Sequence, residues 1–63
     1  MPKTDVEVEL SEQDGNAMSI MSRVARALKK NGHADLIDGF MKEAMSGDYD
    51  HVLQTCIDYV VVS

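Results

Sequence analysis

The chain begins with an alternating pattern of apolar and acidic residues. Over Val6–Leu10, valine or leucine alternates with glutamate, which is the period of two expected for a strand with one buried face. The six residues that follow, 11–16, are rich in turn formers, and a side-chain oxygen of Asp14 or Asn16 can cap a following helix. The pattern predicts a strand, a turn and a helix start.

From residue 17 the hydrophobic period changes to that of an α-helix. Lys29 and Lys30 suit the negative end of the helix dipole, and Asn31-Gly32 is a suitable C-terminal stop. A helix over residues 17–30 is therefore predicted. Its apolar face comprises Ala17, Ile20, Met21, Val24, Ala25 and Leu28, with Met18 at the margin.

Two further helices are predicted, one over about residues 34–45 and one that begins after a cap at Asp48. Gly39 lies on the polar side of the second helix, where its low helix propensity suggests a close approach by another backbone. The expected buried face of the second helix is Leu36, Ile37, Phe40, Met41, Ala44 and Met45. That of the third is Tyr49, Val52, Leu53, Cys56, Ile57 and Val60.

The last residues favour a strand over a helix. Val60, Val61 and Val62 are β-branched, so we expect a short final strand that pairs with Val6–Leu10. The predicted fold is a small, mainly helical α+β domain, in which three short helices accompany a two-stranded ribbon of order β-α-α-α-β. It spans residues 1–63, with residues 1–5 frayed. A fully helical bundle with frayed ends is the alternative.

Composition narrows the class of protein. The chain has 63 residues, 44% of them hydrophobic and 27% charged, which is typical of one small globular domain. No apolar run approaches about 18 residues, so we expect no membrane span, and no secretory signal is recognised at the N-terminus. A single cysteine cannot form an intrachain disulfide and favours a reducing cytoplasm.

The net charge of −5 is unevenly distributed. Residues 17–31 contain four basic residues and no acidic one, whereas acidic residues predominate in residues 1–16 and 32–63. This asymmetry is the main electrostatic feature of the chain. A net-negative body disfavours nucleic acid as a partner except at the basic segment.

Three cations of the first helix form a basic stripe. Arg23, Arg26 and Lys30 are spaced i, i+3 and i+7, which places them along one line of the helix, with Ser19 and Ser22 beside them. The stripe could be balanced within the fold by neighbouring acids, dock an acidic partner protein, or contact phosphates. No aromatic residue interleaves it to stack on bases.

Methionine is frequent, and its flexible side chain fills cores and lines adaptable binding surfaces. Three apolar helix faces and Met18 exceed what so small a core can hide, so we expect an exposed patch that marks an interface. The candidate interaction surface comprises Arg23, Arg26, Lys30, Met18, Met41 and Met45.

No catalytic, cofactor or metal site is predicted. The segment from Asp48 to His51 departs from a calcium loop, because Leu53 stands where that loop needs glycine, and a zinc site needs more Cys or His. We expect Asp48 to cap, Asp50 to meet the helix dipole, Tyr49 to pack and His51 to face water. Cys56, which could pair with His33 or His51 as a nucleophile, shares the apolar face and is expected in the core.

Residues 14–62 resemble a group of small uncharacterised proteins of bacteria, bacteriophages and mobile elements. The most specific stretch is Ser46-Gly47-Asp48-Tyr49-Asp50-His51-Val52-Leu53-Gln54-Thr55. Further matching residues are Asp14-Gly15-Asn16-Ala17, Val24, Ala27-Leu28-Lys29-Lys30, Phe40 and Glu43-Ala44. The resemblance implies a phage or mobile-element origin and carries no activity to any position.

The sequence therefore predicts a non-enzymatic, acidic protein–protein interaction or regulatory module that binds a protein partner or a second copy of itself. The alternative is a nucleic-acid-linked regulator, which either contacts phosphates through the basic first helix or mimics DNA with its acidic surface. An enzyme would need a site assembled between subunits, with His51 or Cys56 exposed.

Overall fold

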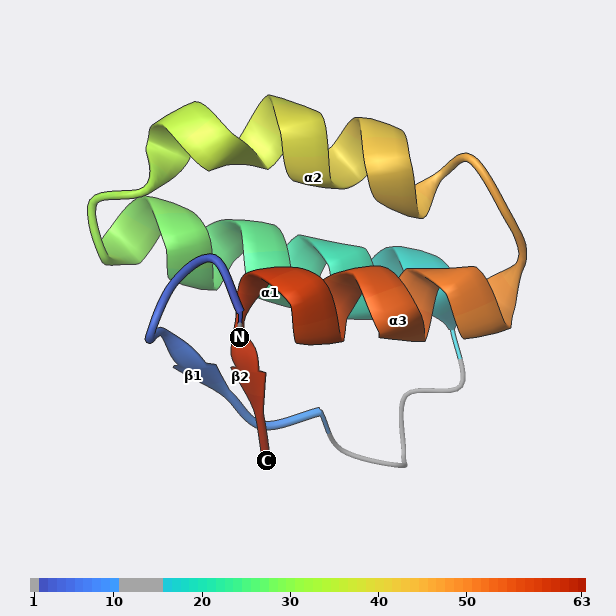
Figure 1. Ribbon diagram of the computed structural model, residues 1–63, viewed down its shortest axis with the longest axis horizontal. Helices are drawn as coiled ribbons and strands as arrows, with labels where there is room; N and C mark the ends of the chain where they lie inside the picture. The colour runs from blue at the N-terminus through green and yellow to red at the C-terminus, as the bar shows by residue number, and fades with distance from the viewer. Residues whose placement is uncertain (1, 11–15) are drawn as a thin grey trace.

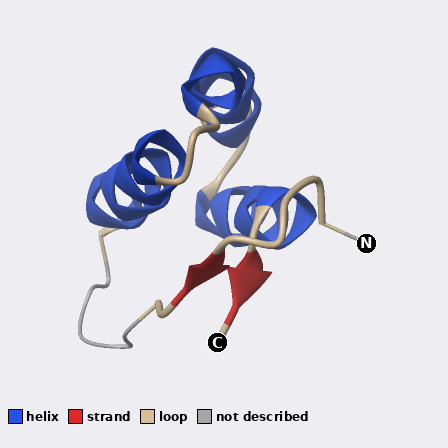
Figure 2. Ribbon diagram, turned by 90° about the vertical axis from the view of Figure 1, so that its left-hand side faces the viewer, coloured by secondary structure: helices blue, strands red, loops and turns tan. Residues whose placement is uncertain are grey.

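In the part of the chain that the structure describes, three helices and a two-stranded parallel sheet make up the fold, which confirms the predicted mainly helical α+β class. The computed structural model describes residues 2–10 and 16–63. The elements are β1 (Glu7–Val8), α1 (Ala17–Lys30), a 3₁₀ turn η1 (Ala34–Leu36), α2 (Ile37–Ala44), α3 (Tyr49–Tyr59) and β2 (Val61–Val62). Helix α1 contacts both other helices and β1, and the strands lie next to α3 on the side away from α2 (Figure 1, Figure 2).

The two strands come from opposite ends of the chain and run parallel. Glu7 is in register with Val61, and Val8 with Val62. The predicted pairing is confirmed, but β1 is shorter than Val6–Leu10 because β2 offers it only two residues. Such a short ribbon is not stable alone, so it depends on the valine side chains that it packs against the helices.

Residues near the N-terminus are hydrogen-bonded to the end of α3, whereas the sequence predicts that residues 1–5 are frayed. The backbone N–H of Lys3 donates to the carbonyl of Asp58 (2.8 Å), and that of Thr4 donates to Tyr59 (3.1 Å). The Thr4 hydroxyl also donates to the Tyr59 carbonyl (2.7 Å) and accepts from the N–H of Val6 (3.2 Å). At Lys3 and Thr4 the structure differs from the expectation, because the last carbonyls of a helix need partners and these two residues supply them.

Helix α1 begins and ends at residues that the sequence identifies. The Asn16 side chain caps it by accepting a hydrogen bond from the N–H of Met18 (2.8 Å). The alternative cap, Asp14, lies outside the described residues. At the other end, Gly32 has a φ of 82°, the left-handed conformation that favours glycine and lets the chain leave the helix.

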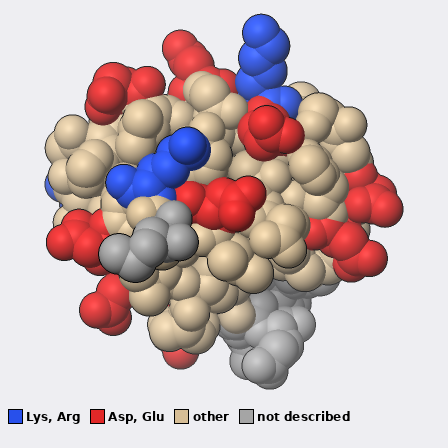
Figure 3. Space-filling model, viewed as in Figure 1, with Lys and Arg blue, Asp and Glu red and all other residues tan. Residues whose placement is uncertain are grey.

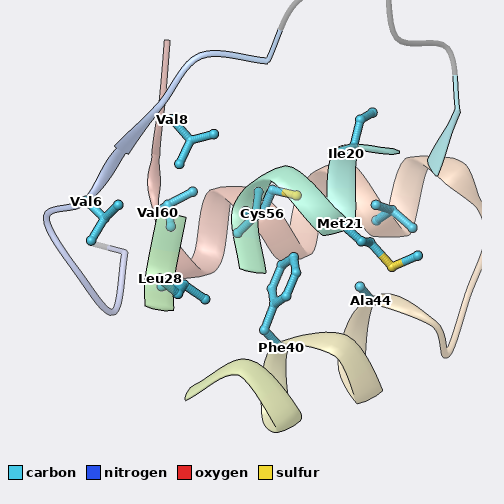
Figure 4. Packing of buried hydrophobic residues seen from close by; sticks show 11 residues of the cluster. Val6, Val8, Ile20, Met21, Leu28, Phe40, Ala44, Cys56 and Val60 are labelled. Atoms are coloured by element: carbon cyan, nitrogen blue, oxygen red, sulfur yellow. The ribbon is translucent and has the colours of Figure 1, made fainter. Parts of the chain in front are cut away.

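The core forms where the inner faces of the helices meet the strands (Figure 4). Phe40 lies within it, and its ring packs edge-to-face on Tyr59 with the centroids 5.4 Å apart. Cys56 is fully buried, as predicted. The buried hydrophobic residues are Val6, Val8, Ile20, Met21, Val24, Leu28, Phe40, Ala44, Val52, Cys56 and Val60.

Three residues assigned to buried faces are instead exposed, and for them the prediction is wrong. Met45 is 62% exposed because α2 ends at Ala44 and the chain then turns away. Tyr49 is 40% exposed as the first residue of α3, and Ile57 is 52% exposed because it lies at the border of the buried face of that helix. Helical spacing identifies a face but not how far the neighbouring elements cover it.

Candidate interaction surface

Helix α1 exposes every basic residue that it carries. Arg23, Arg26, Lys29 and Lys30 are all exposed, and the helix contains no acidic residue. The opposite face of α1 is buried in the core, which fixes the cationic face toward solvent. This arrangement follows from the amphipathic pattern, because the cations occupy helical positions outside the apolar face.

An open hollow of about 420 Å³ lies over the first part of this cationic face. The hollow is lined by Met18, Ser19, Ser22, Arg23 and Arg26. The two serines and two arginines have i, i+3, i+4 and i+7 spacing, so their side chains are neighbours on the helix surface. Two hydroxyls and two guanidinium groups therefore border one recess.

Arg23 has a role within the fold. Its Nη1 donates to the backbone carbonyl of Glu9 at 3.1 Å, which connects α1 to the chain that leaves β1. Because this acceptor is a backbone carbonyl and not a carboxylate, the contact does not test the interpretation that neighbouring acids balance the stripe. Sequence reasoning did not find this contact, because a carbonyl acceptor leaves no signature in the residue types.

The face formed by α2 and α3 is acidic. Figure 3 shows Asp and Glu side chains spread over this face with few Lys or Arg, and α1 lies behind it in the same view (Figure 1). The described acidic residues are all exposed and lie outside α1: Asp5, Glu7, Glu9, Asp35, Asp38, Glu43, Asp48, Asp50 and Asp58. Among the described residues, α1 is therefore the basic element, and acidic residues predominate in the rest of the chain.

The structure separates the methionines of the predicted surface. Met18 is 54% exposed and lines the hollow beside the arginines, whereas Met41 is half-buried and packs against the core. Met45 is exposed beyond the end of α2 and does not line the hollow. The structure therefore brings Met18 together with Arg23 and Arg26 but does not place the other two methionines at the hollow.

The cluster around His51 joins the end of α2 to the start of α3. The Asp48 side chain caps α3 by accepting from the His51 N–H (3.0 Å), as predicted. The His51 ring was expected to face water, but its Nε2 lies 3.0 Å from the Glu43 carbonyl, 3.1 Å from the Glu43 carboxylate and 3.1 Å from the Ser46 hydroxyl. A serine–base–acid relay uses both ring nitrogens, so contacts that converge on Nε2 indicate a structural junction.

Glycine is required at the same junction by close packing. A Cβ added at Gly47 would lie 2.7 Å from Cβ and Cγ of His51. The prediction for Gly39 was a close backbone, but an added Cβ there would lie 3.4 Å from the hydroxyl of Tyr59. The neighbour of Gly39 is thus a side chain of α3 within the same molecule.

Burial makes Cys56 a poor nucleophile. Desolvation in the core raises the pKa of its thiol to about 11, so the reactive thiolate is scarce at neutral pH. Among the residues that the structure describes, no group of three or more His, Cys, Asp or Glu side chains is placed to hold a metal ion. Nor does any helix in the described segments have the length and apolar character needed to cross a membrane.

Comparison with protein-family models, curated proteins and solved structures gives no match for this chain. The function of the chain is therefore inferred from its own residues. Ser19 and Ser22, predicted to lie beside the basic stripe, share the hollow with Met18.

Proposed function

We propose that this chain is a non-enzymatic interaction module that binds an acidic surface of a partner protein through the cationic face of α1. The observation that carries the proposal is the segregation of charge. The cations of α1 are all exposed and the helix itself contains no acidic residue, while the rest of the described surface is rich in Asp and Glu. We further propose that the module acts in the cytoplasm, where its free thiol at Cys56 stays reduced.

Because the cations of α1 are exposed, each adds little to the free energy of binding a partner. An exposed ion pair is worth only about 0.2–1 kcal/mol, so the cations serve mainly to orient the partner and to speed association. Apolar contact must supply the remaining affinity, and Met18 is the exposed apolar residue at the hollow. The acidic side of the molecule repels a second acidic surface and so restricts docking to α1.

The test compares two double variants with the same change in net charge. Arg26→Glu with Lys30→Glu reverses the cationic face of α1, and Lys3→Glu with Lys42→Glu makes the same reversal outside that helix. Arg23 is left unchanged because it is bonded to Glu9. The tagged proteins are used to capture partners from host lysate, both with and without nuclease.

We expect the unmodified protein and the Lys3/Lys42 variant to retain a stoichiometric protein partner and the Arg26/Lys30 variant to lose it. Equal capture by both variants would refute a role for the cationic face. If the unmodified protein captures nothing, a heterologous partner loses its basis. Sedimentation must then show self-association for the interaction proposal to stand.

A nucleic-acid-linked role is the alternative that the same cations favour. Phosphate contacts release counterions, so binding to nucleic acid would weaken steeply as salt rises. In the capture experiment, a partner that disappears on nuclease treatment would favour this alternative. If the acidic face instead mimics DNA, it would bind a DNA-binding protein, and the Arg26→Glu and Lys30→Glu variant would still capture that protein.

A further inference from the structure

The hollow on α1 has the donor set of an oxyanion site. Ser19 and Ser22 provide hydroxyl donors, and Arg26 provides an exposed planar guanidinium. Arg23 lines the same recess, and its bond to the Glu9 carbonyl fixes the position of its charge before any ligand arrives. Donors held in place by the fold reduce the ordering cost of binding.

We infer that this hollow binds a phosphate monoester carried by a side chain of the partner protein. This inference rests on the proposed function and names the group that the cationic face recognises. A phosphoserine carries about −1.5 to −2 charges and three acceptor oxygens, which suits two guanidinium and two hydroxyl groups better than the two oxygens of a carboxylate. The hollow, at about 420 Å³, has room for the adjoining peptide as well as the phosphate.

A phosphopeptide fits this surface better than a nucleic acid does. None of the described residues that line the hollow is aromatic, so these residues offer bases no ring on which to stack. A nucleic acid also extends a line of phosphates beyond the recess, toward a molecule whose described surface outside α1 is rich in acids. A single phosphate places its charge at the two arginines among the described residues that line the recess.

The test measures the affinity of fluorescently labelled peptides by anisotropy. Three peptides of neutral sequence differ at one position, which is phosphoserine, glutamate or serine. The protein variants are Arg26→Gln and Ser22→Ala, and Lys42→Gln is the matched control because it removes an exposed cation from α2. Far-UV circular dichroism verifies that each variant keeps its helices.

We expect the phosphoserine peptide to bind at least about tenfold more tightly than the serine peptide, with glutamate between them, because hydrogen bonds to charged groups are the stronger class. Arg26→Gln should weaken binding of the phosphopeptide about threefold or more, while Lys42→Gln leaves it nearly unchanged. Amide chemical shifts of the unmodified protein should move at Ser19 and Ser22 on titration with the phosphopeptide.

Equal affinity for the phosphoserine and serine peptides would overturn the inference, as would equal losses in the Arg26 and Lys42 variants. A single-stranded oligonucleotide that displaces the phosphopeptide at lower concentration than free phosphoserine would also overturn it in favour of nucleic acid. The proposed function fails separately: if lysate capture depends on Arg26 and Lys30 but no phosphopeptide binds, the cationic face is an interface and the hollow is not a phosphate site.

Discussion

Two buried threonines allow the same chemical change to be made in two different hydrogen-bonding situations. Thr4 is 7% exposed and Thr55 is 1% exposed, and in both residues the hydroxyl donates to a backbone carbonyl. Only the Thr4 hydroxyl also accepts, from the backbone N–H of Val6 at 3.2 Å. Replacing each by valine keeps the shape of the side chain and removes the hydroxyl.

The two substitutions should differ in their effect on the free energy of unfolding. Thr4→Val leaves the buried N–H of Val6 without its acceptor, and an unsatisfied buried donor costs about 1–3 kcal/mol. Thr55→Val leaves no such group, because the carbonyl of His51 lies within α3 and keeps its helical hydrogen bond. We therefore expect a change within about 0.5 kcal/mol for Thr55→Val, with stabilisation allowed by the added apolar methyl.

Urea denaturation followed by far-UV circular dichroism measures this difference. With a slope near 1 kcal/mol per molar urea, Thr4→Val should lower the midpoint by about 1–3 M and Thr55→Val by less than about 0.5 M. A domain of this size rarely has more than about 3–5 kcal/mol of stability, so the series is run in sulfate, which strengthens the folded state of all three proteins. Equal midpoints for the two variants would refute the assignment of the Thr4 hydroxyl as the acceptor that secures the N-terminal segment.

Three further predictions test the core and the exposed side chains. Phe40→Ala should cost about 3–5 kcal/mol and abolish the cooperative unfolding transition, whereas Phe40→Leu should retain it. Burial raises the pKa of Cys56 from 9.0 to about 11, so between these pH values only the unfolded chain loses the thiol proton. The free energy of unfolding should therefore be unaffected by this thiol below pH 9 and should fall above it by up to about 1.4 kcal/mol per pH unit. In urea titrations at several pH values, Cys56→Ala should remove this slope. Under mild peroxide, peptide mapping should find Met18 and Met45 oxidised before Met21, which is 3% exposed, and equal rates would contradict the assigned burial.

The candidate surface was only partly predictable from the sequence. The i, i+3 and i+7 spacing of Arg23, Arg26 and Lys30 placed three cations on one side of a helix, and the structure shows all three exposed. The methionines could not be placed in this way, because whether Met18 or Met41 is exposed depends on which neighbouring element covers it. The anchoring of Arg23 was unpredictable because its acceptor is a backbone atom.

Local patterns determined the elements of this protein. The change from a period of two to the helical period, a first cap at Asp14 or Asn16, the stop at Gly32 and the cap at Asp48 are all encoded within a few residues of where they act. The structure has each of them, with Asn16 as a cap of α1. Such signals operate through the backbone of their own segment, so no knowledge of the rest of the chain is needed to read them.

Tertiary structure decided everything that joins distant segments. The parallel register of β1 and β2, the bonds from Thr4 to the end of α3 and the contact of Arg23 with Glu9 each unite residues that no local pattern connects. The hollow on α1 likewise becomes defined only when the helix is held with its apolar face inward. The periodicity of the sequence indicates which face of an element is apolar, whereas the arrangement of the other elements determines which residues that face packs against.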